Sequence, residues 1–109
     1  MRERAARVVP RKPITVAIEN TRQSRSYGVV ANISDGGACL LTDARFILGE
    51  SLRLELSFFR EPECVPAAGR VVWSTGNADT GAVRYGLQWI APAVDPRLRG
   101  LIEQAGVAG

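Results

Sequence analysis

Residues 51–59 read Ser-Leu-Arg-Leu-Glu-Leu-Ser-Phe-Phe, and this stretch shows most plainly which kind of fold the chain adopts. Large apolar side chains occupy every second position from residue 52 to residue 58, and polar ones stand between them. Successive side chains of a strand point to opposite faces of a sheet. The stretch therefore predicts a strand with one face in a core and the other in water, as in an antiparallel sheet.

The same alternation recurs on both sides of this stretch and predicts five more short strands. Turns rich in Gly, Asn, Asp and Ser separate them. The further predicted strands cover residues 14–18, 27–34, 37–41, 65–74 and 83–89. Between the second and third of them stands Asp35-Gly36, a dipeptide typical of a two-residue type I′ hairpin turn in which both residues have positive φ.

Only the C-terminal end has a helical period. Asp95 suits the N-cap and Pro96 the first helical position, and Gly106 is expected to end the helix. Apolar residues recur between them at helical spacing, namely Leu98, Leu101, Ile102 and Ala105. The chain is therefore predicted to be all-β, a small barrel or sandwich that one short amphipathic helix closes.

The charge is concentrated at the N-terminus. The chain has 109 residues, which suits one domain, and a net charge of +3. Residues 1–25 carry seven basic and two acidic side chains, whereas the remainder carries seven and nine. Pro10 and Pro13 disfavour a helix in the first segment. We expect residues 1–12 to form an extended basic arm that meets an anionic partner, and residues 13–105 to form the folded domain.

The composition argues against an enzyme. Without any histidine, a Ser-His or Cys-His nucleophile pair is impossible, and no phosphate-binding glycine loop follows a strand. We expect no catalytic residue, no metal site and no cofactor. Cys39 and Cys64 are expected to be small core residues without a disulfide. We find no secretory signal and no membrane span, so we expect a cytoplasmic protein.

Two short motifs carry the functional interest. Arg7 and Arg11 form an RxxxR on the arm, and residues 32–37 read Asn-Ile-Ser-Asp-Gly-Gly, an NxSxxG. Asn32 and Ser34 are two residues apart, so both are predicted to point away from the face that carries Ile33. An amide and a hydroxyl there can bind the edge of a base, and the glycines let a ligand approach the backbone.

In this order the motifs resemble those of the PilZ family, whose signature is RxxxR followed by [D/N]xSxxG. Residues 38–40, 69–73 and 85–89 also look like the later strands of that family. The resemblance implies a six-stranded antiparallel barrel with a C-terminal helix, and binding of cyclic di-GMP. It further implies roles for five residues in that binding. Arg7 and Arg11 would hold phosphates and guanine edges, Asn32 and Ser34 would hydrogen-bond a guanine, and Gly37 would permit close approach.

Two other arginines are weaker candidates for ligand contacts. Arg4 lies on the arm, and Arg70 lies on the polar face of its strand. Trp73 shares the predicted face of Val71, so we expect it to pack in the core, although an exposed indole could stack on a base or an arginine.

Three functions follow for comparison. The first is a bacterial cyclic di-GMP receptor in which the ligand orders the arm and the changed surface binds an effector protein. The second is a PilZ-like adaptor that binds only proteins. The third is a basic barrel for single-stranded nucleic acid, which usually needs an outward aromatic platform. We expect Tyr27, Tyr85, Trp73 and Trp89 to face mostly inward, which makes the third function the weakest.

Overall fold

The computed structural model describes residues 9–10, 12–20, 24–76, 82–90 and 97–105 of the chain. They form six strands and one helix, as predicted. The elements are β1 (Thr15–Glu19), β2 (Arg25–Ile33), β3 (Gly37–Thr42), β4 (Ser51–Ser57), β5 (Val65–Gly76), β6 (Val83–Trp89) and α1 (Arg97–Ala105). The predicted strands differ from the observed ones by no more than two residues at either end.

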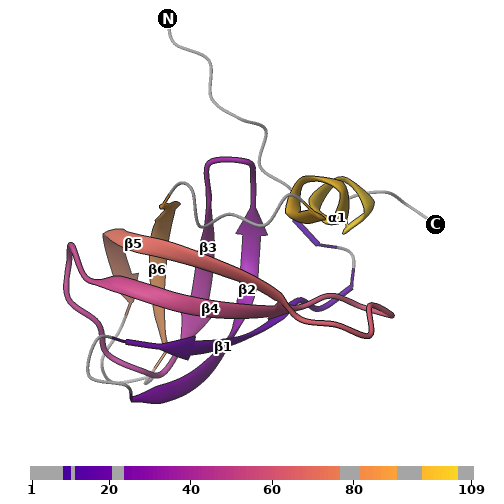
Figure 1. The fold of residues 1–109 in the computed structure, drawn as a ribbon. Coiled ribbons are helices and arrows are strands. Elements are labelled where there is room, and N and C mark those ends of the chain that lie inside the picture. The colour runs from indigo at the N-terminus through magenta and orange to yellow at the C-terminus, as the bar shows by residue number, and fades with distance from the viewer. Residues whose placement is uncertain (1–8, 11, 21–23, 77–81, 91–96, 106–109) are drawn as a thin grey trace, which may run out of the picture.

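All strand pairs are antiparallel, and the strands close into a barrel in the order β1-β2-β3-β6-β5-β4 (Figure 1). The prediction of an all-β fold is confirmed in the form that the family resemblance implied, a six-stranded barrel with one C-terminal helix. Closure gives each of the described strands a hydrogen-bonded neighbour on both sides.

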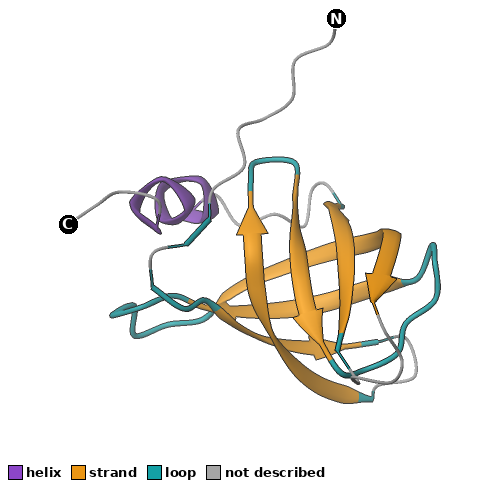
Figure 2. Ribbon diagram, turned by 180° about the vertical axis from the view of Figure 1, so that it is seen from behind, coloured by secondary structure: helices purple, strands orange, loops and turns teal. Residues whose placement is uncertain are grey.

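Alternate residues of the strands fill the barrel with apolar side chains, most of them aliphatic. Leu52, Leu54 and Leu56 of β4 are each at most 2% exposed, which is the inward face that residues 51–59 predicted. The helix completes the core, because Leu98 and Ile102 are buried in the same cluster. Figures 1 and 2 place α1 and the β2–β3 turn at the same end of the barrel. Asp95, Pro96 and Gly106, the predicted ends of the helix, lie outside the described residues.

Two β-bulges change which side chains face outward. Val30 pairs with Leu40 but Asn32 pairs with Cys39, so Ala31 is an extra residue in β2. Val72 is likewise extra in β5, between Val71 and Trp73. One extra residue reverses the alternation of a strand.

The bulges overturn two expected orientations. Tyr27 is 65% exposed and Trp73 is 39% exposed, so the prediction that they face inward was wrong. The prediction holds for Tyr85 and Trp89, which are both buried. The outer surface therefore presents two of the four Tyr and Trp side chains.

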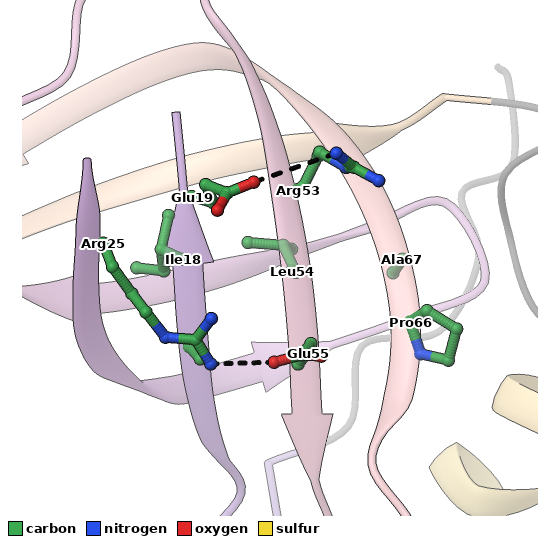
Figure 3. Close-up of a pocket in the computed structure, with 9 residues that line it drawn as sticks. Ile18, Glu19, Arg25, Arg53, Leu54, Glu55, Pro66 and Ala67 are labelled. Atoms are coloured by element: carbon green, nitrogen blue, oxygen red, sulfur yellow. Dashed lines mark hydrogen bonds and ion pairs between the residues drawn. The ribbon is translucent and has the colours of Figure 1, made fainter. Parts of the chain in front are cut away.

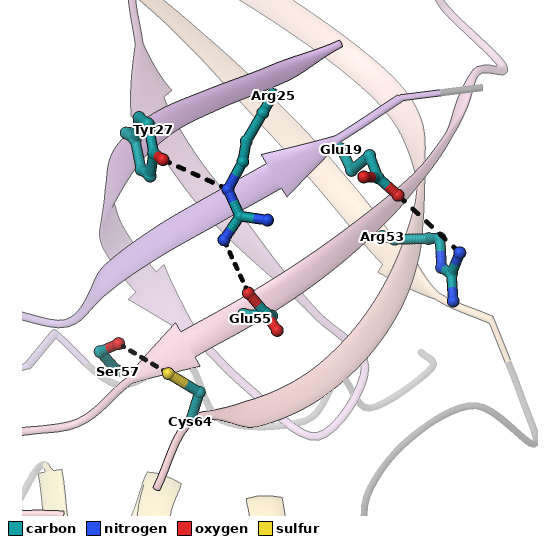
Figure 4. Close-up of polar contacts among 7 residues, drawn as sticks. All are labelled: Glu19, Arg25, Tyr27, Arg53, Glu55, Ser57 and Cys64. Atoms are coloured by element: carbon teal, nitrogen blue, oxygen red, sulfur yellow. Dashed lines mark hydrogen bonds and ion pairs between the residues drawn. The ribbon is translucent and has the colours of Figure 1, made fainter. Parts of the chain in front are cut away.

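Cys64 also departs from its prediction. It immediately precedes the buried Val65, so the alternation turns it outward, and its Sγ lies 3.3 Å from Ser57 Oγ (Figure 4). Cys39 is buried, and both cysteines are free thiols. In the part of the chain that the structure describes, no helix has the length and apolar character that crossing a membrane requires.

Candidate functional site

The NxSxxG motif lies on one outer wall of the barrel, and strand pairing brings other residues beside it. In one row across the strands, Gly37 of β3 pairs with Gln88 of β6, which pairs with Arg70 of β5. Neighbouring strands are about 4.8 Å apart, so the Cα atoms of Gly37 and Arg70 are roughly 10 Å apart.

A second row lies next to the first. Asn32 of β2 pairs with Cys39, Cys39 pairs with Gly86, and Gly86 pairs with Trp73. We call the residues of both rows, which the register places on the outer face of the barrel, together with Ser34, the motif wall; Gly37, Cys39 and Gly86 are buried within it. It comprises Asn32, Ser34, Gly37, Cys39, Arg70, Trp73, Gly86 and Gln88. Asn32 faces outward and is half-buried, whereas Ile33 is fully buried, as predicted.

Ser34 holds the shape of the turn rather than projecting into solvent. It is only 4% exposed. Its hydroxyl accepts a hydrogen bond from the Gly36 N–H at 3.2 Å and donates one to the Gly37 carbonyl at 3.4 Å. Its backbone N–H also donates to the Gly37 carbonyl, at 2.8 Å. Ser34 therefore contributes to the motif wall mainly by ordering the backbone of the turn.

The turn is not the predicted type I′ turn. Asp35 and Gly36 do not have positive φ, which among the described residues occurs at Arg60 and Gly49. The reason lies in β6: the Trp89 N–H donates to the Gly36 carbonyl, and the Trp89 indole N–H donates to the Ser34 carbonyl, both at 3.0 Å. These hydrogen bonds, together with those of the Ser34 hydroxyl, hold the turn without the positive φ angles of a type I′ turn.

Gly37 is required by the barrel itself. A Cβ at this residue would lie 1.9 Å from the carbonyl oxygen of Leu87 in β6. Since that contact is with backbone, no side-chain movement relieves it. Gly36, by contrast, is exposed, and a Cβ there would meet only Ser34 Oγ at 3.9 Å. The open approach to backbone that the motif predicts is therefore at Gly36.

Trp73 lies across Gly86 on the outside of the barrel. A Cβ at Gly86 would lie 2.1 Å from both Cε2 and Nε1 of the indole, so the ring fills the place of the missing side chain. The indole remains 39% exposed. It thus offers an aromatic surface beside the NxSxxG turn.

Arg70 and Gln88 present polar groups on the same wall. Both side chains are exposed, and neither makes a hydrogen bond or ion pair with another residue that the structure describes. The sequence analysis selected Arg70 but missed Gln88. The alternation in residues 83–89 already turns Gln88 outward, but only the pairing of β6 with β3 and β5 places it between Gly37 and Arg70.

Strand β1 begins at the end of the barrel that carries the motif. Arg4, Arg7 and Arg11 lie outside the described residues. The root of the arm is fixed, because the Val30 N–H donates to the Ile14 carbonyl at 2.9 Å. Since β1 is antiparallel to β2, the chain preceding Ile14 heads toward the motif end of β2. An extended chain spans up to about 3.5 Å per residue, so Arg7 and Arg11 can reach the motif wall.

The family model for the PilZ domain matches residues 1–104. The chain belongs to the PilZ domain family. The match includes the arm with its RxxxR as well as the barrel. A sequence search of curated proteins gave no significant match.

Solved structures of PilZ proteins have the same fold. MotI/DgrA, the inhibitor of motility of Bacillus subtilis, is 19% identical with a TM-score of 0.70, over 96% of this chain and 50% of that one. YcgR of Escherichia coli in complex with c-di-GMP is 14% identical with a TM-score of 0.71, over 94% and 43%. The PilZ domain of YcgR with c-di-GMP is 12% identical with a TM-score of 0.69, over 97% and 89%. This chain thus spans about half the length of MotI/DgrA and of YcgR.

The opposite wall of this PilZ barrel has a different character. A cavity of about 260 Å³ opens there over β1, β4 and the first residues of β2 and β5, and four of its lining residues are charged (Figure 3). Arg25 pairs with Glu55 at 2.9 Å, and Arg53 pairs with Glu19 at 3.8 Å. The hydrogen bonds that the Arg25 guanidinium donates to the Tyr27 hydroxyl and to Glu55 raise the pKa of Arg25 (Figure 4). The charges balance, so this cavity lacks the free positive charge of the motif wall.

Proposed function

We propose that this chain is a receptor for cyclic di-GMP in a bacterial cytoplasm, without catalytic activity of its own. The observation that carries the proposal is the motif wall. It gathers an amide, an exposed indole and an arginine without a described partner on adjacent rows of one barrel face. The membership in the PilZ family supports the proposal, and the free thiols of Cys39 and Cys64 suit a reducing compartment.

The chemistry of the wall suits a guanine nucleotide. The Asn32 amide can donate to and accept from a guanine edge. Trp73 can stack on a purine, and Arg70 can bind a phosphate or the O6/N7 edge of guanine with its planar fork. In the proposed complex, Ser34 and Gly37 act mainly by fixing the shape of the turn that follows Asn32 at the end of β2.

The arm supplies the remaining positive charge. We propose that Arg7 and Arg11 close over the bound nucleotide and grip its phosphates and guanine edges, with Arg4 as a further phosphate contact. The arm then takes one ordered position on the barrel. Such a transition changes the surface that an effector protein meets. The fixed root at Ile14 supports this geometry, because it directs the arm toward the motif end of the barrel.

Calorimetric titration of the full chain with cyclic di-GMP near physiological salt tests the proposal, with GTP as the control. We expect saturable binding of cyclic di-GMP and none of GTP. The stoichiometry will show whether the ligand binds as one molecule or as an intercalated pair. No heat and no shift of the melting temperature would contradict the proposal and favour the protein-only adaptor.

A second candidate function gains some support from the bulges. Because Tyr27 and Trp73 face outward, the chain has exposed aromatic side chains on which single-stranded nucleic acid could stack. A gel-shift experiment with mixed single strands at two salt concentrations distinguishes this function. Binding at low salt that weakens steeply as salt rises would favour nucleic acid. We favour cyclic di-GMP because the NxSxxG turn lies beside Trp73 on the same wall.

A further inference from the structure

Strand β6 carries one more outward arginine beyond the motif wall. Outward positions of β6 alternate, and they are Arg84, Gly86 and Gln88. Gly86 and Gln88 belong to the motif wall already described. Arg84 forms a third row, in which it pairs with Leu41 of β3 and Thr75 of β5. This row adjoins Trp73 on the side away from Gln88 and Arg70.

Arg84 is a positive charge without a described counter-charge. Its side chain is exposed and makes no hydrogen bond or ion pair with another residue that the structure describes. Its two cross-strand partners, Leu41 and Thr75, are uncharged. The arginines of the opposite wall differ, since Arg25 and Arg53 each have a carboxylate partner.

The two arginines of this face lie on either side of the indole. Successive outward residues of one strand are about 6.8 Å apart, so Gln88 and Arg84 are roughly 14 Å apart along β6. Arg70 lies beside Gln88, and Trp73 covers Gly86 between the two ends. Across three rows of β3, β5 and β6, the outward residues thus include two arginines and no carboxylate; Asp35 lies in the turn, at the far end from Arg84.

A cyclic dinucleotide has two phosphodiester groups and therefore needs positive charge in two places. We propose that Arg84 is a second phosphate contact of the ligand, on the side of Trp73 opposite to Arg70 and the NxSxxG turn. This inference rests on the proposed function. It assigns one phosphate to Arg70 and the other to Arg84, while a base lies on the indole between them.

The test is calorimetric titration of the full chain with cyclic di-GMP, using Arg84→Gln, Arg70→Gln and Arg53→Gln. The three substitutions remove the same charge, but Arg53 lies on the opposite wall and is 84% exposed. A hydrogen bond to a charged group contributes enough to change Kd about tenfold. We expect Arg84→Gln to raise Kd by about that factor and to reduce the salt dependence of binding, with Arg53→Gln close to wild type.

The outcomes separate this inference from the proposed function. If the wild-type chain does not bind, both fail. If it binds and Arg70→Gln weakens binding while Arg84→Gln matches Arg53→Gln, the assignment of Arg84 alone is overturned. Equal weakening by Arg84→Gln and Arg53→Gln would indicate a general charge effect and would also overturn it. Should Arg84→Gln lower the melting temperature, Arg84→Lys keeps the charge but loses the fork, and we expect an intermediate Kd.

Discussion

The indole of Trp73 occupies the space that a side chain at Gly86 would need. A Cβ at residue 86 would lie 2.1 Å from two atoms of the ring. This relationship depends on the bulge at Val72, which turns Trp73 outward and over β6. An apparently ordinary strand glycine and a one-residue irregularity together place an aromatic ring beside the NxSxxG turn.

Gly86→Ala should therefore displace the indole without breaking the barrel. The ring can swing into solvent, so we expect a loss of stability within the range of about 1–3 kcal/mol for overpacking. Cyclic di-GMP should bind more weakly, because the stacking surface moves away from Asn32 and Arg70. Tryptophan fluorescence and thermal unfolding measure the two effects. An unshifted emission spectrum with unchanged affinity would contradict the role that we assign to this pair.

Gly37→Ala should destabilise the barrel strongly, whereas Gly36→Ala should change little. At residue 37 the new Cβ would meet the Leu87 carbonyl at 1.9 Å, and strands β3 and β6 would have to separate. We expect a cost of about 3 kcal/mol or more. At residue 36 the nearest atom is 3.9 Å away, so the change should stay within about 0.5 kcal/mol. Urea unfolding of both variants measures the contrast, and similar midpoints would refute it.

The sequence predicted the elements well because each depends on a local pattern. The alternation in residues 83–89 matches β6 from end to end, and residues 51–59 predict the inward leucines of β4. A bulge has no such pattern. Ala31 and Val72 are ordinary strand residues, and nothing in the sequence marks them as unpaired. The predicted faces of Tyr27 and Trp73 were wrong for this reason.

The candidate site could be predicted only in part for a related reason. A motif names residues that are close in sequence, such as Asn32 and Ser34. Gln88 and Arg84 join the same face only through the pairing of β6 with β3 and β5, which is a long-range property. The need for a glycine at residue 37 likewise depends on a long-range contact, because it arises from the close approach of β3 to the Leu87 carbonyl.

Trp89→Phe should weaken both folding and ligand binding. It removes the indole N–H that donates to the Ser34 carbonyl at 3.0 Å, which leaves a buried acceptor unpaired. Such a loss costs about 1–3 kcal/mol. Tyr85→Phe is the matched control, because the Tyr85 hydroxyl bonds Ala44 and Phe46 in the loop after β3, away from the motif turn.

Both aromatic variants should lower the urea midpoint, but only Trp89→Phe should raise the Kd for cyclic di-GMP. The physical reason is that Trp89 fixes the turn that follows Asn32, whereas Tyr85 fixes a loop outside the motif wall. If the two variants change Kd equally, the hydrogen bond from the Trp89 indole to Ser34 does not set the geometry of the binding site, and the prediction is wrong.

Arg7→Ala and Arg11→Ala test the arm directly. Each removes a guanidinium that we expect to bind a phosphate or a guanine edge, and a hydrogen bond to a charged group contributes about 1.5–3 kcal/mol. We therefore expect each variant to raise the Kd about tenfold to a hundredfold. The melting temperature without ligand should not change, because both residues precede the first residue of β1 by at least four positions. Arg53→Ala, on the opposite wall, controls for net charge. Calorimetry and thermal unfolding of the wild type and the three variants measure these effects. Wild-type affinity in both arm variants would mean that the barrel binds its ligand without the arm, and the proposed ordering of the arm would then be wrong.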